Sequence, residues 1–154
     1  MDIFNKRVIL ANFVLAQMSL IVIIFVILLE ISMADKLMIM MVNTDPSNGS
    51  ELGAPFFQAT VAAAMEYEVE VILTARAGEL AVKGVAEKLF VKEGSPKSVY
   101  DFIKDAHEAG VVFKVCTPTL ELWGEDLIPE IQETIGGAYV IQQAMDDDVV
   151  TLTY

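Results

Sequence analysis

This sequence is poor in the residue types that most often carry chemistry. Among 154 residues there is one cysteine, Cys116, and one histidine, His107. A single cysteine excludes an internal disulfide framework and a zinc cluster built from cysteine ligands. The glycine patterns that bind dinucleotides and nucleotide phosphates are missing as well. Any covalent chemistry is therefore expected at Cys116.

Basic residues are also few. Ten lysines and arginines stand against 22 aspartates and glutamates, which gives a formal net charge of −12. The charges in residues 1–32 cancel, so the whole excess belongs to the rest of the chain. Such an acidic surface repels phosphates and attracts basic proteins, so nucleic acid is not expected as a partner. Solubility through net charge is a simpler explanation of the same composition.

The first 32 residues differ from the rest. Residues 8–29 carry no charge, and a helix of that length spans roughly 30 Å of hydrocarbon. Taken alone, this run predicts a transmembrane helix. A cleaved signal peptide and a spurious extension, with translation starting at Met33, are the alternatives. We therefore divide the chain into residues 1–32 and a domain at 33–154, which is cytoplasmic or is anchored to a membrane by residues 8–29.

Apolar runs alternate with helical patterns from residue 37 onwards. The expected strands are 37–42, 69–74, 111–115 and 149–153, with a possible further strand around Ile131. The expected helices are 52–67, one from Ser95-Pro96 to Gly110, a short one at 120–123 and a last one at 138–145, while 76–93 is left as loop and short helix. Strands that are apolar on both faces and alternate with helices indicate a parallel sheet covered on both sides. The prediction is an α/β fold of about five strands, preceded by an N-terminal hydrophobic helix.

Cys116 stands at the edge of this sheet where ligands gather, the carboxyl ends of the strands. Thr117 is a plausible N-cap and Pro118 suits the first helical position, so free backbone N–H groups would point back at the sulfur. Such a setting favours the thiolate, which is the reactive form of cysteine. Buried packing is the alternative, because free cysteine is among the most buried residue types.

The segment Gly110-Val-Val-Phe-Lys-Val-Cys116-Thr-Pro-Thr-Leu-Glu-Leu-Trp-Gly124 resembles the signature region of the DsrE/DsrF-like family. Residues 36–55 and 136–154 are similar to that family too. The resemblance implies a flavodoxin-like fold with strand order near 2-1-3-4-5 and assembly into homotrimers or hexamers. In characterised branches it implies a cysteine that carries persulfide sulfur between partner proteins, and Cys116 matches that position. The chain has no second cysteine, so an intramolecular disulfide cycle is excluded.

Other candidate residues flank the strand ends. Asn43, Thr44 and Asp45 follow the first strand, where they can bind a small ligand or simply make a turn. Thr117 and Thr119 are further ligand-binding candidates beside Cys116. We expect His107 to be an exposed surface histidine and not a base for the thiol. Trp123 is expected to pack over the site or in a subunit interface.

Two functions are consistent with these residues. The first is a sulfur relay, in which Cys116 accepts a sulfur atom from a donor protein and passes it to an acceptor protein, without metal or organic cofactor. The second is a non-catalytic oligomeric module that binds a small ligand or another protein through its strand-end loops. Whether the protein is an enzyme depends on the reactivity of Cys116.

Overall fold

The computed structural model describes Val22 and residues 34–154. The hydrophobic segment expected at residues 1–32 lies outside this range, apart from Val22, and the unit described below is Ala34–Tyr154. In the part of the chain that the structure describes, no helix has both the length and the apolar character needed to cross a membrane.

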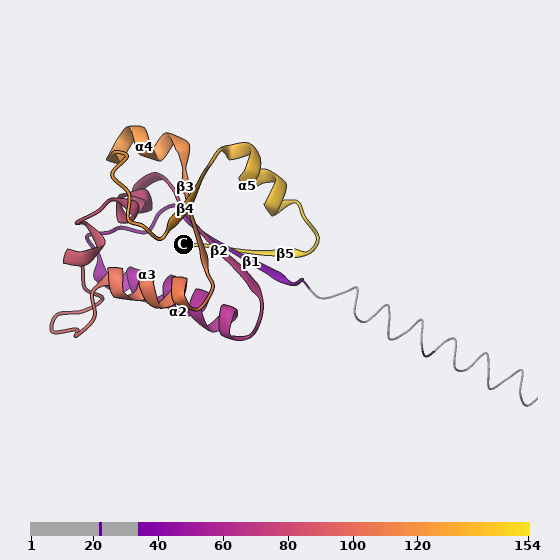
Figure 1. Ribbon diagram of the computed structural model, residues 1–154, viewed down its shortest axis with the longest axis horizontal. Coiled ribbons are helices and arrows are strands. Elements are labelled where there is room, and N and C mark those ends of the chain that lie inside the picture. Colours follow the sequence, from indigo (N-terminus) through magenta and orange to yellow (C-terminus); the bar gives the residue numbers. More distant parts are fainter. Residues whose placement is uncertain (1–21, 23–33) are drawn as a thin grey trace, which may run out of the picture. The chain divides into compact units, whose positions relative to one another are not determined.

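The centre of the domain is a sheet of five parallel strands (Figure 1). They are β1 (Lys36–Met41), β2 (Glu68–Leu73), β3 (Val112–Cys116), β4 (Ile131–Ile135) and β5 (Val149–Thr153). Every neighbouring pair is parallel. The predicted α/β class and the parallel sheet of about five strands are therefore confirmed.

The order of the strands, however, is β4-β3-β2-β1-β5, and the expected order near 2-1-3-4-5 is wrong. Strand–helix–strand connections are almost always right-handed, so the face on which a helix lies decides the direction in which the sheet grows. The connections from β1 to β4 all contribute to the core on one face, so these strands follow one another across the sheet. Only the last connection uses the opposite face and returns the chain to β5 beside β1.

Helices cover the two faces unequally. Helix α2 (Gly49–Ala64) and helix α3 (Val99–Glu108) lie side by side on one face, below the sheet in Figure 1, over the larger core. Two short 3-10 helices, η1 (Ala75–Ala81) and η2 (Ala86–Lys88), and helix α4 (Thr117–Trp123) also contribute to that core. The other face carries helix α5 (Gly137–Ala144), which packs on a small cluster of Met38, Ile72 and Ile135.

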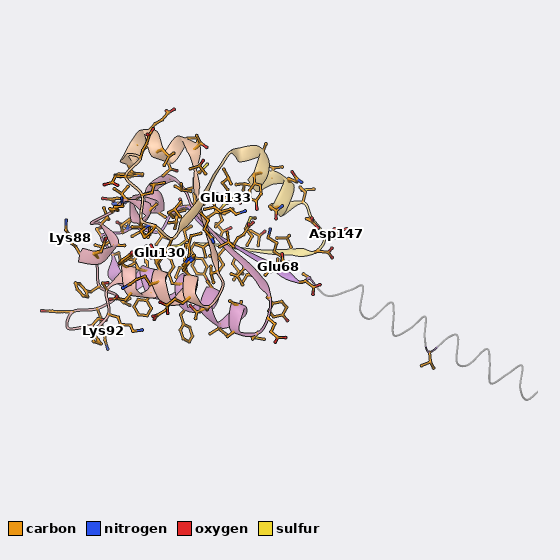
Figure 2. The ribbon with its side chains drawn as sticks, viewed as in Figure 1. Glu68, Lys88, Lys92, Glu130, Glu133 and Asp147 are labelled. Carbon is orange, nitrogen blue, oxygen red and sulfur yellow. The ribbon has the colours of Figure 1, made fainter. Side chains whose placement is uncertain are left out.

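Successive side chains along a strand point to opposite faces of the sheet, which explains the two cores. In β3, Phe113 and Val115 face the larger core, whereas Lys114 points to the α5 face. Exposed charges such as Lys88, Lys92 and Asp147 extend from the periphery of the domain (Figure 2). The buried and exposed sets are therefore well separated, except for Glu70 and Lys114 on the α5 face and for Glu130, which accepts a hydrogen bond from Tyr100.

Helix α3 begins three residues later than the expected start at Ser95-Pro96. Its N-cap is Ser98, whose hydroxyl accepts a hydrogen bond from the backbone N–H of Asp101, while the Asp101 carboxylate accepts one from the backbone N–H of Ser98. This reciprocal capping box satisfies two backbone donors, so it is a stronger start signal than a proline in the first turn.

Candidate functional site

Cys116 ends β3 and is the N-cap residue of α4. The expected N-cap, Thr117, is instead the first residue of the helix, and its hydroxyl donates to the carbonyl oxygen of Ile135 at 3.0 Å. The side chain of Cys116 accepts no capping hydrogen bond and is half-buried. The thiol therefore lies at the strand edge beside a helix start, and it is not sealed in the core.

The two connections nearest Cys116 leave the sheet toward opposite faces. After β3 the chain enters α4, which packs with η1 and the larger core, and after β4 it enters α5, which packs on the other face (Figure 1). In open α/β sheets, ligands bind at the carboxyl ends of two neighbouring strands whose following connections go to opposite faces. Cys116 pairs with Ile135 in the register of β3 and β4, so it stands at this switch point.

The start of α5 forms the other side of the switch point. Its N-cap is Gly136, no side chain caps the helix, and Gly137 is its first residue. A Cβ at either glycine would meet no atom within 4 Å, so the space beside the backbone is open. Uncapped N–H groups at a helix start bind anions. The sequence had not marked these glycines as candidates, although two glycines between a strand and a helix are the available signal.

Helix α4 is held in place by contacts to η1. Thr119 is 2% exposed and packs against Gly78, so it holds the helix against η1 and is not accessible at the surface. Trp123 donates its indole N–H to the carbonyl oxygen of Ala75 at 2.7 Å. Ala75 has a φ of 48°, a left-handed conformation that is uncommon for residues other than glycine. Trp123 therefore packs against the residue that follows Thr74 at the start of η1, with 38% of its surface exposed, and its expected place over the site or in a subunit interface stays a prediction.

Asn43, Thr44 and Asp45 follow β1, which is separated from β3 by β2. Strand spacing places the ends of β1 and β3 roughly 10 Å apart, so these residues do not adjoin Cys116 directly. Asn43 is exposed, whereas Thr44 is buried and its hydroxyl has no hydrogen-bond partner in the described part of the chain. This unpaired hydroxyl remains a candidate ligand contact.

Asp45 is tied into its own loop. Its carboxylate accepts hydrogen bonds from the hydroxyl and the backbone N–H of Ser47 and pairs with Arg76 at 3.0 Å. The two bonds from Ser47, and to a smaller extent the Arg76 charge, lower the pKa of Asp45 below its ordinary value. Arg76 follows β2, the strand between the two groups of candidates, and sequence analysis did not single it out.

The environment of His107 also differs from the expectation. It is half-buried and not exposed, and its Nδ1 is buried with no hydrogen-bond partner among the described residues. His107 lies in the last turn of α3, which leads into the amino end of β3, whereas Cys116 lies at the carboxyl end. The expectation that His107 is no base for the thiol is consistent with this placement.

Comparison with known proteins gives one informative result. No protein-family model matches the chain, and no curated protein matches its sequence. Among solved structures, the chain is similar to the ychN protein from E. coli, with a TM-score of 0.61 and 17% sequence identity. The match covers 77% of this chain and 99% of the E. coli chain. At this identity the likeness shows a common fold.

Proposed function

We propose that this protein is a sulfur-relay protein that carries persulfide sulfur on Cys116. The thiolate of Cys116 attacks the outer sulfur of a donor persulfide, R–S–S–H. A new bond forms between this sulfur and Cys116, the bond inside the donor breaks, and the donor leaves as a thiolate R–S⁻. An acceptor thiolate then takes the sulfur in the same way, so the relay needs no external oxidant or reductant.

The observation that carries this proposal is the position of Cys116 at the switch point between α4 and α5. A persulfide is an anion at neutral pH, and the open start of α5 offers uncapped N–H groups next to the strand that pairs with β3. The half-buried side chain is accessible enough for exchange with another thiol. The resemblance to the DsrE/DsrF-like family, and a fold shared with the ychN protein from E. coli, are consistent with this activity.

Apolar side chains beside the cysteine support a protein partner. On α4, Leu122 is 67% exposed and Trp123 is 38% exposed. Exposed aromatic and aliphatic groups near a reactive residue are typical of contact surfaces between proteins. We therefore propose that the donor and the acceptor dock on α4, and that the relay acts in the cytoplasm, where a lone cysteine stays reduced.

A homo-oligomer, trimeric or hexameric, is part of the same proposal. Phe57, Val61 and Met65 recur at every fourth position along α2 and its C-cap and are all exposed. Residues at this spacing share one helix face, and such an apolar stripe suits a subunit contact. Sedimentation of the full chain and of Val61→Glu tests this point, because a monomer in both samples contradicts it.

The relay is tested by incubating the full chain with a persulfide donor and measuring its intact mass. We expect a gain of one sulfur atom that a reducing agent reverses and that Cys116→Ser abolishes. Thr117→Val, which removes the hydroxyl bond to Ile135 and keeps the thiol, is the control for folding. The absence of any sulfur gain, with a Cys116 that also resists alkylation in the native protein, would falsify the relay.

The role of the α5 start is tested by a matched pair of variants. Gly137→Pro removes one N–H from the first helical position, where proline is tolerated, and Gly137→Ala keeps it. The extended backbone of Gly136, with φ −103° and ψ 169°, is compatible with a following proline. We expect about a fivefold slower sulfur loading in Gly137→Pro than in Gly137→Ala, since one hydrogen bond to an anion is worth about 1 kcal/mol or more.

A non-catalytic binding module is the second candidate, and the unpaired hydroxyl of Thr44 favours it. A small ligand at the end of β1 would supply the partner that this buried group lacks. Under this alternative, Cys116→Ser leaves ligand binding unchanged and Thr44→Val weakens it. If Cys116 is unreactive and the two variants affect ligand binding in this way, the protein is a binding module and not a sulfur relay.

A further inference from the structure

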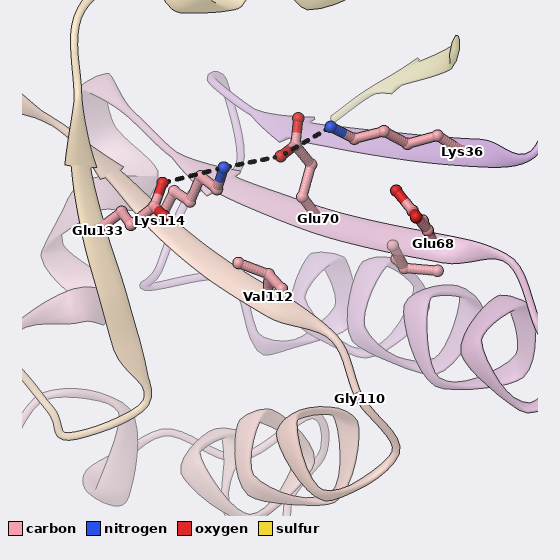
Figure 3. Close-up of a pocket in the computed structure, with 8 residues that line it drawn as sticks. Lys36, Glu68, Glu70, Gly110, Val112, Lys114 and Glu133 are labelled. Atoms are coloured by element: carbon pink, nitrogen blue, oxygen red, sulfur yellow. Dashed lines mark ion pairs between the residues drawn. The ribbon is translucent and has the colours of Figure 1, made fainter. Parts of the chain in front are cut away.

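The α5 face of the sheet holds a second candidate site, which extends toward the amino ends of the strands, whereas Cys116 ends β3 at its carboxyl end. A pocket of about 270 Å³ lies over the amino ends of β2 and β3, with Gly110 and Val112 among its lining residues. Figure 3 shows its charged side chains on the side of the sheet opposite to the nearby helices. Helix α5 packs on Met38, Ile72 and Ile135 and borders the pocket through Tyr139 and Gln143, but none of its residues lines it.

A chain of ion pairs crosses this pocket from β1 to β4 (Figure 3). Glu70 Oε2 accepts from Lys114 Nζ at 3.1 Å and from Lys36 Nζ at 3.3 Å. Lys114 also reaches Glu133 at 3.1 Å and the hydroxyl of Tyr139 at 2.5 Å, and this hydroxyl donates to Glu70. Burial acts against the charge of Lys114, but its hydrogen bonds outweigh this effect and raise the pKa of Lys114 above its ordinary value.

In this network the hydrogen-bond donors of the lysines already have partners, whereas some carboxylate oxygens have none. The three N–H groups of Lys114 have three partners, and Lys36 also bonds Gln143. By contrast, Glu70 is only 2% exposed and its Oε1 is buried without a hydrogen-bond partner among the described residues. Glu68 lines the same pocket with an exposed carboxylate that forms no ion pair with any described residue. A ligand that completes the pocket must therefore bring donors.

We propose that this pocket binds the cationic end of an aliphatic amine or guanidine. Three carboxylates, Glu68, Glu70 and Glu133, stand against the two ammonium groups of Lys36 and Lys114, so a cation balances the charge. An anion would have to compete with carboxylates for both lysines. Val112 supplies an apolar surface for a hydrocarbon stem, and the net charge of −12 attracts cations to the protein. Free polyamines and the side chains of lysine or arginine share this chemistry.

The test is a ligand-observed NMR titration of the full chain with four small molecules that share one stem. Butylammonium and butylguanidinium are expected to bind with a dissociation constant of about 1 mM, an affinity typical of a few-atom ligand. Butanol and pentanoate are the uncharged and the anionic controls, and neither should bind. A lysine residue with blocked termini, run in parallel, distinguishes a protein side chain from a free amine as the natural ligand, according to which binds more tightly.

Two variants localise the binding. Glu68→Gln removes an exposed carboxylate from the pocket, and we expect it to weaken butylammonium about fivefold, as for a partly exposed ion pair. Glu121→Gln makes the same charge change on α4, outside the pocket, and should leave the affinity unaltered. The proposal is overturned if neither cation binds at 50 mM, if butanol binds equally well, or if the two variants weaken binding to the same extent. None of these results depends on the reactivity of Cys116.

Discussion

The contact between Gly78 and Thr119 leads to a sharp prediction, because it joins η1 to the helix that begins beside Cys116. A Cβ on Gly78 would lie 1.7 Å from Cγ2 of Thr119 and 3.1 Å from its Cβ. Thr119 is 2% exposed, so its methyl group cannot move into solvent. Gly78→Ala therefore forces α4 away from η1.

The magnitude follows from two opposing effects. Overpacking of a buried contact costs about 1–3 kcal/mol. Alanine also lowers the conformational entropy of the unfolded chain, which stabilises the fold by about 0.4–1 kcal/mol. This gain applies here because Gly78 does not have the left-handed backbone that disfavours a side chain. We expect Gly78→Ala to lower the free energy of unfolding by about 1–2 kcal/mol.

Thr119→Ser provides the matched partner because it removes only the clashing methyl group. Alone it should cost about 1 kcal/mol, the value of one buried methyl. In the double variant the clash is relieved, so the combined loss should be smaller than the sum of the single losses by about 1–2 kcal/mol. Urea unfolding with a constant m value measures all four free energies. Additive losses, within about 0.5 kcal/mol, would show that the two residues do not press on each other.

Three other outcomes are expected from the same kind of measurement. Phe113→Ala, at a fully buried ring, should cost about 3–5 kcal/mol, and a loss below 1 kcal/mol would mean that the ring is not packed as described. Glu70→Gln should lower the free energy of unfolding by about 3 kcal/mol, because it leaves the buried ammonium group of Lys114 without its buried carboxylate. Glu133→Gln, at a side chain that is 58% exposed, should lower it by less than about 1 kcal/mol. Equal losses would contradict the buried ion pair. Hydrogen bonds from Lys104 and from the α3 cap lower the pKa of Asp101 from 3.8 to about 2, so its stabilisation is complete above pH 3.8 and disappears as the pH falls through 2. The difference in melting temperature between the natural chain and Asp101→Asn should therefore shrink from pH 5 to pH 2, and a constant difference would refute the assignment.

The strands were the most predictable part of the fold. The closing strand was expected at 149–153, and β5 is Val149–Thr153. The first two strands agree to within one residue at each end. Apolar runs between turn residues reveal β1 and β2, which are largely buried in the sheet, whereas β5 is an exposed edge strand that shows itself by alternation of apolar and polar residues. Local pattern was therefore sufficient to predict the elements and the α/β class.

The order of the strands and the face on which each helix packs could not be predicted from local sequence patterns. The strand order depends on the face that each connection takes, and no local pattern in 137–144 reveals that α5 lies opposite to α4. The switch point at Cys116 exists only because α4 and α5 pack on opposite faces, so the candidate role of Gly136 and Gly137 was missed although Cys116 was singled out. The ion pairs around Glu70 were missed for a similar reason, since their members come from separate strands and from α5.

The hydrogen bond between Trp123 and Ala75 also gives the protein a built-in optical probe. Trp123 is the only tryptophan in the chain, and it sits on the helix that starts at Cys116. Indole fluorescence is sensitive to solvent, so its emission reports selectively on this corner of the domain, without any label. Loading of the thiol, docking of a second protein or loosening of α4 can each be followed as a change in colour or intensity of that single emitter.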